Sequence, residues 1–362
     1  MLLTAVWLLP IVGAVVVDLL PRVYARWAGI AVALIELALT LVLAIALIPH
    51  RTGFQFQVTL PWVPQYGISY SMGVDGLSVW LLLLNSFLTL VGLFVTPAAT
   101  QRLRGFVALM LLLEGAMAGV FLATDLLLFY VFWEAMLIPA YFLLWLWGED
   151  RRPDRAALKF VIYTLVGSLL MLVGVIGEYV FAGGGRHTFD LATLAAHPPD
   201  AGIQFGLFFV FALAFLIKAP IVPFHSWLPT AYRAAPIGFL VVLAGTMGKT
   251  GLYALLRIVL PLFPNPTLWW NWHPVLPVLA IIAILWGALM AIAQRDIKLL
   301  VAYSSVSHMG FILLGIFSLT QQGAEGAVIL MVSHGLTIAA LFLIVSWIER
   351  RTGTRDREAL SN

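Results

Sequence analysis

The segment IQFGLFFVFALAFLIKAPIVPFHSWLP, residues 203–229, contains the feature that decides the fold. Fifteen residues without a charge precede Lys218, and two prolines, Pro220 and Pro223, follow it. Proline donates no main-chain hydrogen bond and disfavours helix in the residue before it, so we expect an interruption near 219–223. Such a break is tolerated at membrane depth where it is buried in protein or lines a hydrated cavity. The segment therefore predicts a broken transmembrane helix with a lysine at the break. The alternative is an ordinary kink with a lysine that extends to the interface.

Apolar runs of this kind recur along the whole chain. Its 362 residues are 62% hydrophobic and only 10% charged, whereas soluble proteins have about 25% charged residues. About 20 apolar residues are enough to cross a hydrocarbon core of ~30 Å. The sequence therefore predicts an all-α, multi-pass transmembrane helix bundle, a single integral membrane domain over residues 1–362 without a soluble domain. The eleven expected spans are 2–20, 27–48, 76–95, 104–123, 126–147, 157–181, 203–223, 236–258, 275–293, 297–317 and 324–347.

Basic residues predict the orientation of these spans. With the N-terminus outside, fifteen of the twenty lysines and arginines lie in inner loops or in the C-terminal tail, and two lie in outer loops. Cytoplasmic loops carry an excess of basic residues, so we expect the N-terminus outside and the C-terminus inside. The first run carries Asp18 and no basic residue before it, so we expect it to remain as a helix. We interpret the basic loop GEDRRPDRAALK, residues 148–159, as a topology determinant and not as a nucleic-acid patch.

A few ionisable residues remain at membrane depth. A charge at the centre of a transmembrane helix costs about 2.5–3.5 kcal/mol on insertion scales, so such residues mark function by default. Glu134 lies near the middle of its run, with Pro139 five residues on. We expect it to approach Lys218, because pairing lowers the cost of both charges. The alternative is a lone acid that stabilises a helix–helix contact. The full set is Glu36, Glu114, Glu134, Lys218, Lys249, His308 and His334.

Lys249 is the deepest of the cations, thirteen residues after Pro236. Thr246 and Tyr253 are three and four residues away and are expected on the same helical face. His308 lies four residues after Ser304, and His334 lies three residues before Thr337. Each histidine is therefore expected on the same helical face as a hydroxyl side chain. Either histidine alone could be a hydrogen-bonded packing residue.

Together these residues form a candidate proton relay. Histidine titrates near neutral pH. Burial lowers the pKa of a lysine, and a nearby carboxylate raises it again. Glu134, Lys218, Lys249, His308 and His334 are the predicted members, with Glu114, Ser304, Thr337 and Tyr253 as accessories. Glu36 is a weaker candidate, since it is alone in a second helix that looks peripheral.

Several site classes have no support in the sequence. The chain has no cysteine, which excludes disulfides, thiolate metal sites and Fe–S ligation by its own residues. The two histidines are on different helices without a carboxylate in either core, so we predict no metal site. We find no catalytic nucleophile with a base and no cofactor-binding fingerprint.

Five motifs resemble one known family. In chain order they are GVDGLSVWLLLLNSFL, FYVFWEAMLIP, KAPIVPFHSWLP, LLVAYSSVSHMGFILLG and MVSHGLTIAALF. They are similar to subunit 4 (chain M) of the proton-pumping NADH–quinone oxidoreductase, respiratory complex I. That family belongs to the antiporter-like superfamily, which includes subunits of cation/proton antiporters.

The resemblance implies roles and partners. Glu134 and Lys218 would match the acid of the fifth helix and its partner lysine, Lys249 the central lysine, and His308 and His334 the relay that follows. Residues 1–103 would be N-terminal helices, 104–258 a first antiporter-like repeat and 259–362 a truncated second repeat. The partners would be adjacent antiporter-like subunits of the membrane arm and the lipid bilayer, in a bacterial cytoplasmic membrane. FMN, Fe–S clusters and quinone would be bound only by partner subunits.

The sequence departs from the family in two places. Family members have about fourteen helices, so the resemblance implies that the last three, including a broken twelfth, are missing here. Where the family typically reads LPDAHTEAP, this chain reads LPTAYRAAP, residues 228–236. Thr230, Tyr232 and Ala234 thus remove ionisable groups near the inner mouth, and Arg233 adds a charge. Two alternatives to a proton-translocating subunit stay open: a shortened, non-pumping structural subunit of the same arm, and a cation/proton antiporter component.

Overall fold

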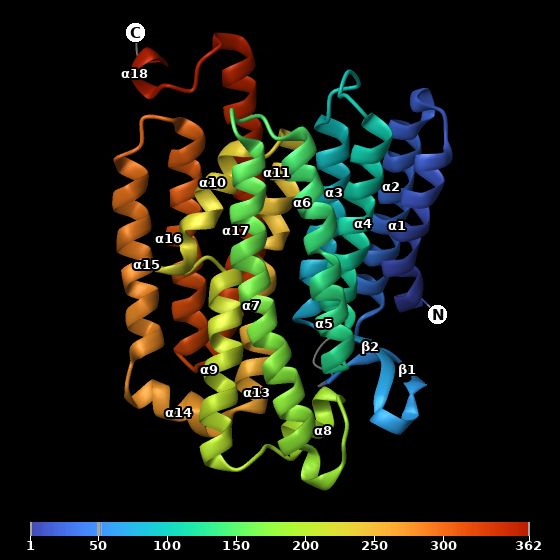
Figure 1. The fold of residues 1–362 in the computed structure, drawn as a ribbon, viewed down its shortest axis with the longest axis vertical. Helices are drawn as coiled ribbons and strands as arrows, with labels where there is room; N and C mark the ends of the chain where they lie inside the picture. Colours follow the sequence, from blue (N-terminus) through green and yellow to red (C-terminus); the bar gives the residue numbers. More distant parts are fainter. Residues whose placement is uncertain (1, 49–50, 52, 361–362) are drawn as a thin grey trace.

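The computed structural model of this chain describes residues 2–48, 51 and 53–360. It is a bundle of long helices that lie roughly side by side (Figure 1). In the described residues, eleven helices are long and apolar enough to cross a membrane, which confirms the predicted all-α multi-pass fold. These spans are Leu2–Leu19, Arg22–Ala46, Ser78–Val95, Leu103–Leu122, Leu126–Trp147, Pro153–Phe181, Ala201–Lys218, Ile237–Leu262, Val275–Ile292, Ile297–Phe317 and Gln321–Thr352.

Nine of the spans are single helices, or are interrupted by at most one residue. They comprise α1 (Leu2–Leu19), α2 (Arg22–Ala46), α3 (Ser78–Val95), α4 (Leu103–Leu122), α5 (Leu126–Ala135) with α6 (Leu137–Trp147), α7 (Pro153–Phe181), α15 (Val275–Ile292), α16 (Ile297–Phe317) and α17 (Gln321–Thr352). The eleventh extends beyond the predicted 324–347, because a helix does not have to end where its apolar run ends.

The seventh and eighth spans are composite. The seventh is α9 (Ala201–Lys218), which a turn separates from α10 (Trp227–Ala234). The eighth contains α11 (Ile237–Val242), α12 (Lys249–Ala254) and α13 (Leu260–Leu262), joined by π-helical turns at Leu243–Met247 and Leu255–Val259. Almost all residues in the apolar part of the eighth span are buried, so this span lies at the centre of the bundle. Short helices α8 (Leu191–Ala196), α14 (Pro264–Trp272) and α18 (Arg357–Leu360) lie outside the spans.

A β-hairpin was not predicted from the sequence. Residues 49–75 were expected to be an outer loop, but β1 (Gln55–Val63) pairs antiparallel with β2 (Ile68–Val74). Gly67 forms the turn with φ 64°, and a Cβ there would lie 2.1 Å from the carbonyl oxygen of His187. Only glycine therefore fits both the backbone and the space.

The two ends of the bundle differ in charge. We call the side with α18 and the loops 20–21, 96–102, 148–152, 235–236 and 293–296 the basic face, because most arginines lie there. We call the opposite side, with the β1–β2 hairpin, α8 and α14, the hairpin face (Figure 1). The N-terminal α1–α4 and the C-terminal α15–α17 form the two flanks, and α11 contacts both α3 and α17 between them.

Candidate functional site

The break in the seventh span lies where the two prolines predict it. The helix α9 ends at Lys218, and a turn follows before α10 begins. Its exposed carbonyls find donors, since Trp227 Nε1 donates to the Ile217 oxygen at 2.9 Å and Ile221 N to the Leu216 oxygen at 3.1 Å. Lys218 is 3% exposed, so it does not extend to the interface. The broken helix is confirmed, and the alternative of a simple kink with an interfacial lysine is wrong.

Lys218 and Glu134 are close neighbours but not a salt bridge. The ammonium lies 5.4 Å from the ring centre of Trp133 and 5.8 Å from that of Phe160, and such cation–π contacts stabilise a buried charge. Glu134 follows Trp133 at the α5–α6 junction, and its carboxylate acts electrostatically on Lys218. Within the described residues no ion pair of 4.0 Å or less joins the two, and Glu134 Oε1 is buried without a hydrogen bond.

Lys249 lies at the centre of the bundle. It is fully buried between the two π-helical turns, and its ammonium donates to the Ala244 carbonyl. Two residues on, Gly251 lets this helix approach the break, because a Cβ there would lie 2.6 Å from the Phe215 oxygen and 2.8 Å from Ala219 N. Close packing therefore brings the backbone beside Lys249 against the end of α9.

The two histidines come together from different helices. The rings of His308 and His334 are stacked, with centres 5.0 Å apart and planes at 24°. They border a cavity of about 100 Å³ that Ser304, Ser333 and Thr337 also line, which is room for a few waters at about 30 Å³ each. Neither ring nitrogen of His334 has a hydrogen bond in the described chain, and Lys249 and His308 act on it electrostatically.

Three details of the accessory residues differ from expectation. His308 Nδ1 contacts the Ser304 carbonyl at 2.8 Å and not its hydroxyl, which donates to the Val301 oxygen. Tyr253 extends away from Lys249 and donates to the Phe121 oxygen at 3.1 Å. Glu114 lies with Glu36 between α4 and α2, where both carboxyl groups are buried and electrostatically coupled. Glu36 is 1% exposed and lies near Glu114, so the expectation that it is alone in its helix was wrong.

A largely buried ion pair near the hairpin face, with side chains 12% and 20% exposed, was not anticipated. Arg257 donates to both oxygens of Asp75 at 2.6 and 2.7 Å, and its guanidinium lies 4.8 Å from the ring centre of Phe54. Burial raises the pKa of Asp75, but the Arg257 charge and the hydrogen bonds from Arg257, Ser78 and Leu77 outweigh it and hold this pKa below its ordinary value. The only signal in the sequence was an arginine inside an apolar run. Its partner, Asp75, lies 182 residues away along the chain.

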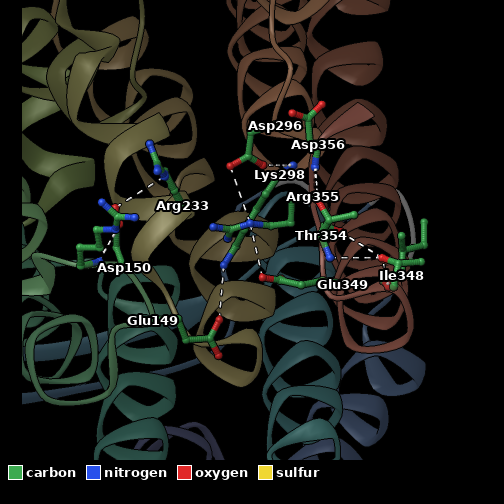
Figure 2. A network of polar contacts seen from close by, with 12 residues as sticks. Glu149, Asp150, Arg233, Asp296, Lys298, Ile348, Glu349, Thr354, Arg355 and Asp356 are labelled. Atoms are coloured by element: carbon green, nitrogen blue, oxygen red, sulfur yellow. Dashed lines mark hydrogen bonds and ion pairs between the residues drawn. The ribbon is translucent and has the colours of Figure 1, made fainter. Parts of the chain in front are cut away.

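A polar network covers the basic face (Figure 2). Lys298 is 4% exposed, although the sequence suggested a loop charge; it pairs with Glu149 at 3.6 Å and donates to the Ala235 oxygen at 3.0 Å. It thus joins the ends of the fifth, seventh and tenth spans. Three further ion pairs surround it: Arg233 with Asp150, and Arg355 with both Asp296 and Glu349.

The described residues contain no group of three or more histidine, cysteine or acidic side chains that could hold a metal ion. The geometry places Glu134 near Lys218, and Lys249 and His308 near His334, close enough for an electrostatic effect in each case. Neighbouring ionisable groups of this kind can exchange protons.

Known proteins are similar to this chain in sequence and in fold. The profile of the family described as "NADH:quinone oxidoreductase/Mrp antiporter, TM" matches residues 123–362. NADH-quinone oxidoreductase subunit M of Mycobacterium tuberculosis is 38% identical over 394 residues, which cover 98% of this chain and 71% of the relative. The relative from Escherichia coli K12 is 39% identical over 348 residues, covering 91% of this chain and 67% of its own.

Two solved structures agree with these relatives. Respiratory complex I from Thermus thermophilus contains a chain with TM-score 0.88 and 38% identity, covering 98% of this chain and 73% of its own. The Mrp complex from Dietzia sp. contains one with TM-score 0.84 and 26% identity, covering 98% of this chain and 38% of its own. This chain therefore belongs to the NADH:quinone oxidoreductase/Mrp antiporter family of membrane subunits, together with subunit M of NADH-quinone oxidoreductase.

Proposed function

We propose that this chain is a proton-translocating membrane-arm subunit of a complex I-like NADH–quinone oxidoreductase. The observation that carries the proposal is Lys249, a fully buried ammonium at the centre of the bundle whose field reaches His334. A buried lysine costs free energy and is retained where its protonation is used. The names of the relatives support the choice of assembly.

The relay begins at the break of the seventh span. The Lys218 ammonium lies over the rings of Trp133 and Phe160, and the negative charge of Glu134 favours its protonated form. When Glu134 is charged, the ammonium is favoured, and when Glu134 is neutral or displaced, Lys218 releases its proton more readily. Gly251 packs the helix that carries Lys249 against this break, and the proposed path from Lys218 to Lys249 crosses that contact.

From Lys249 the proton passes towards the histidines. His334 has two ring nitrogens without protein partners, and the cavity beside it is large enough for water. An imidazole accepts a proton on one nitrogen and releases one from the other. Stacked rings face each other with their planes and not with their nitrogens, so in this proposal water in the cavity carries the proton from His334 on α17 to His308 on α16. Glu114, Ser304, Thr337 and Tyr253 remain accessory residues in this proposal.

The location and partners follow from the same reasoning. We propose a bacterial cytoplasmic membrane, with the N-terminus outside and the C-terminus inside, which the arginines of the basic face support. FMN, Fe–S clusters and quinone belong to partner subunits, because the chain's own residues supply no cysteine for a cluster. Neighbouring antiporter-like subunits pack against its flanks, and residues 104–258 and 259–362 are its two repeats.

One further function has a specific observation in its favour. The likeness to the Mrp complex from Dietzia sp. supports cation/proton antiport by the same relay. Dependence of proton movement on external sodium or potassium, in the absence of NADH, would favour antiport over redox-driven pumping.

The deciding experiment replaces Lys249 with methionine, which keeps length and apolar bulk and removes the titratable group. In vesicles that contain the intact assembly, we expect Lys249→Met to assemble and to move fewer protons per NADH oxidised. Arg186→Gln, in an exposed loop at the hairpin face, is the matched loss of one positive charge and should not change the ratio. An unchanged ratio in Lys249→Met with normal assembly would leave a structural role only.

A further inference from the structure

Tyr232 is a buried residue that the relay described above does not use. It lies on α10, the second half of the broken seventh span, and is 0% exposed. Its ring meets that of Phe342 on α17 edge to face, with centres 5.5 Å apart. Its hydroxyl has no well-formed hydrogen bond within the described residues. A phenylalanine ring would fill the same apolar space, so packing does not explain why this residue carries a hydroxyl.

The hydroxyl reaches the central helix beside Lys249. A Cβ built on Gly248 would lie 3.7 Å from the Tyr232 oxygen and 3.3 Å from Cε of Met309. Gly248 therefore leaves the space that the phenol oxygen approaches, and Lys249 is the next residue. A side chain from the seventh span thus ends at the backbone that carries the central lysine.

A second hydroxyl lies at the same point. Ser305 on α16 is fully buried and interacts with the Tyr232 hydroxyl. Its oxygen likewise has no well-aligned hydrogen bond in the part of the chain that is described. Ser305 is three residues before His308. Two buried hydroxyls, from α10 and α16, therefore lie close together, and that of Tyr232 approaches the eighth span.

We propose that the hydroxyls of Tyr232 and Ser305 form a relay that carries protons from the basic face to Lys249. The proposal rests on the proposed function, because it needs a lysine that exchanges protons. In each step a proton binds the hydroxyl oxygen while the hydroxyl's own proton leaves to the next acceptor, so no charge stays on either residue. The loss of ionisable groups in LPTAYRAAP, residues 228–236, then does not close the inner side.

The basic-face network provides the starting point of this path. Ala235, the C-cap of α10 and three residues after Tyr232, accepts a hydrogen bond from the Lys298 ammonium. Lys298 in turn pairs with Glu149, whose side chain is 50% exposed. An exposed carboxylate is therefore fixed near the end of the helix that carries the tyrosine (Figure 2).

The test removes one oxygen atom at a time. Tyr232→Phe keeps the ring and its contact with Phe342, and Tyr70→Phe is the control, since Tyr70 donates to Thr4 far from the relay. In vesicles that contain the whole assembly, we expect Tyr232→Phe to lower the protons moved per NADH by the same fraction as Lys249→Met. Tyr232→His, which restores a group that exchanges protons, should recover most of the ratio, and Tyr70→Phe should leave it unchanged.

Every outcome decides the proposal. If Lys249→Met lowers the ratio and Tyr232→Phe does not, the relay is wrong while the proposed function stands. If neither variant lowers it, both are overturned. Should Tyr232→Phe fail to assemble, Ser305→Ala removes the second hydroxyl at little cost in packing. A normal ratio in Ser305→Ala would then overturn the relay, and a lowered ratio would support it.

Discussion

Three cations inside the transmembrane spans, Lys218, Lys249 and Arg257, are each stabilised by a different kind of contact. Lys218 lies over two aromatic rings, Lys249 donates to a backbone carbonyl, and Arg257 pairs with Asp75. Only the last has a partner of opposite charge within salt-bridge distance among the described residues. Each of these contacts favours the protonated form of the cation, and a close ion pair does so most strongly. The proposed function requires the two lysines to exchange protons, whereas the Arg257 guanidinium stays charged and serves as a structural charge.

Gly251 tests the contact between the eighth span and the break. A Cβ at this position would overlap the backbone of Phe215 and Ala219, so Gly251→Ala forces the helices apart. We expect the assembly to lose on the order of 1–3 kcal/mol of stability, measured by thermal unfolding in detergent. Gly206→Ala is the matched control, because Gly206 lies on α9 with nothing within 4 Å of a Cβ. Equal melting of the two variants would mean that the close approach has no energetic role.

Spacing in the sequence located these residues better than it located their contacts. The 3.6-residue period placed Tyr253 on the face of Lys249, but the Lys249 side chain reaches back to Ala244, whereas Tyr253 bonds to Phe121 and Arg257. A helical period gives the face of a residue and not the direction in which a long side chain extends along the axis. Proline chemistry, by contrast, acts on neighbouring backbone, and the break near 219–223 was predictable for that reason.

At the scale of elements, the β1–β2 hairpin connects two transmembrane spans at the hairpin face. Asp125 caps α5 by accepting from Leu127 N and Leu128 N, and it also accepts from the backbone and the hydroxyl of Ser69 on β2. Asp75, just after β2, accepts from Arg257 on the eighth span. The hairpin thus links the span that carries Glu134 to the span that carries Lys249. A search for apolar runs does not reveal such an element, since its strands of nine and seven residues are shorter than a transmembrane span and contain polar residues.

The Asp75–Arg257 pair predicts how stability depends on pH. Because the fold lowers the pKa of Asp75, this contribution is complete above the ordinary carboxyl pKa of about 4 and is lost as the pH falls through the lowered value. Asp75→Asn leaves Arg257 buried without its partner. We expect a loss on the order of 3 kcal/mol at neutral pH, and a flatter fall in melting temperature below pH 4 than in the unmodified chain.

An exposed ion pair is the control for this prediction. Asp154→Asn breaks the pair with Arg152, whose side chains are 49% and 59% exposed, and it should not change the melting temperature. If Asp75→Asn melts like Asp154→Asn at neutral pH, the buried pair does not clamp the hairpin to the eighth span.

For the whole molecule, composition and charge predicted most of the architecture. The eleven spans follow from apolar length alone, and the arginines predict the side of each loop. Lys298 shows the limit of that reasoning. Lys298 is the second residue of α16 and was counted as an inner-loop charge. In the structure, Glu149 and the Ala235 carbonyl, from two other loops, contact it. Contacts between segments 63 and 149 residues apart have no local signal, so the basic-face network was visible only in the folded chain.

The orientation of the molecule in the membrane is the last prediction. The chain has no cysteine, so a single introduced thiol reports one position. Arg151 is exposed in a basic-face loop and Arg186 in a hairpin-face loop. With the C-terminus inside, a membrane-impermeant thiol reagent should label Arg186→Cys in intact cells, and Arg151→Cys only in inverted vesicles. Labelling is assigned to this chain by mass after purification of the assembly. The reverse pattern would place the basic face outside, and labelling of both positions from one side would mean that the sixth span, Pro153–Phe181, which lies between them, does not cross the membrane.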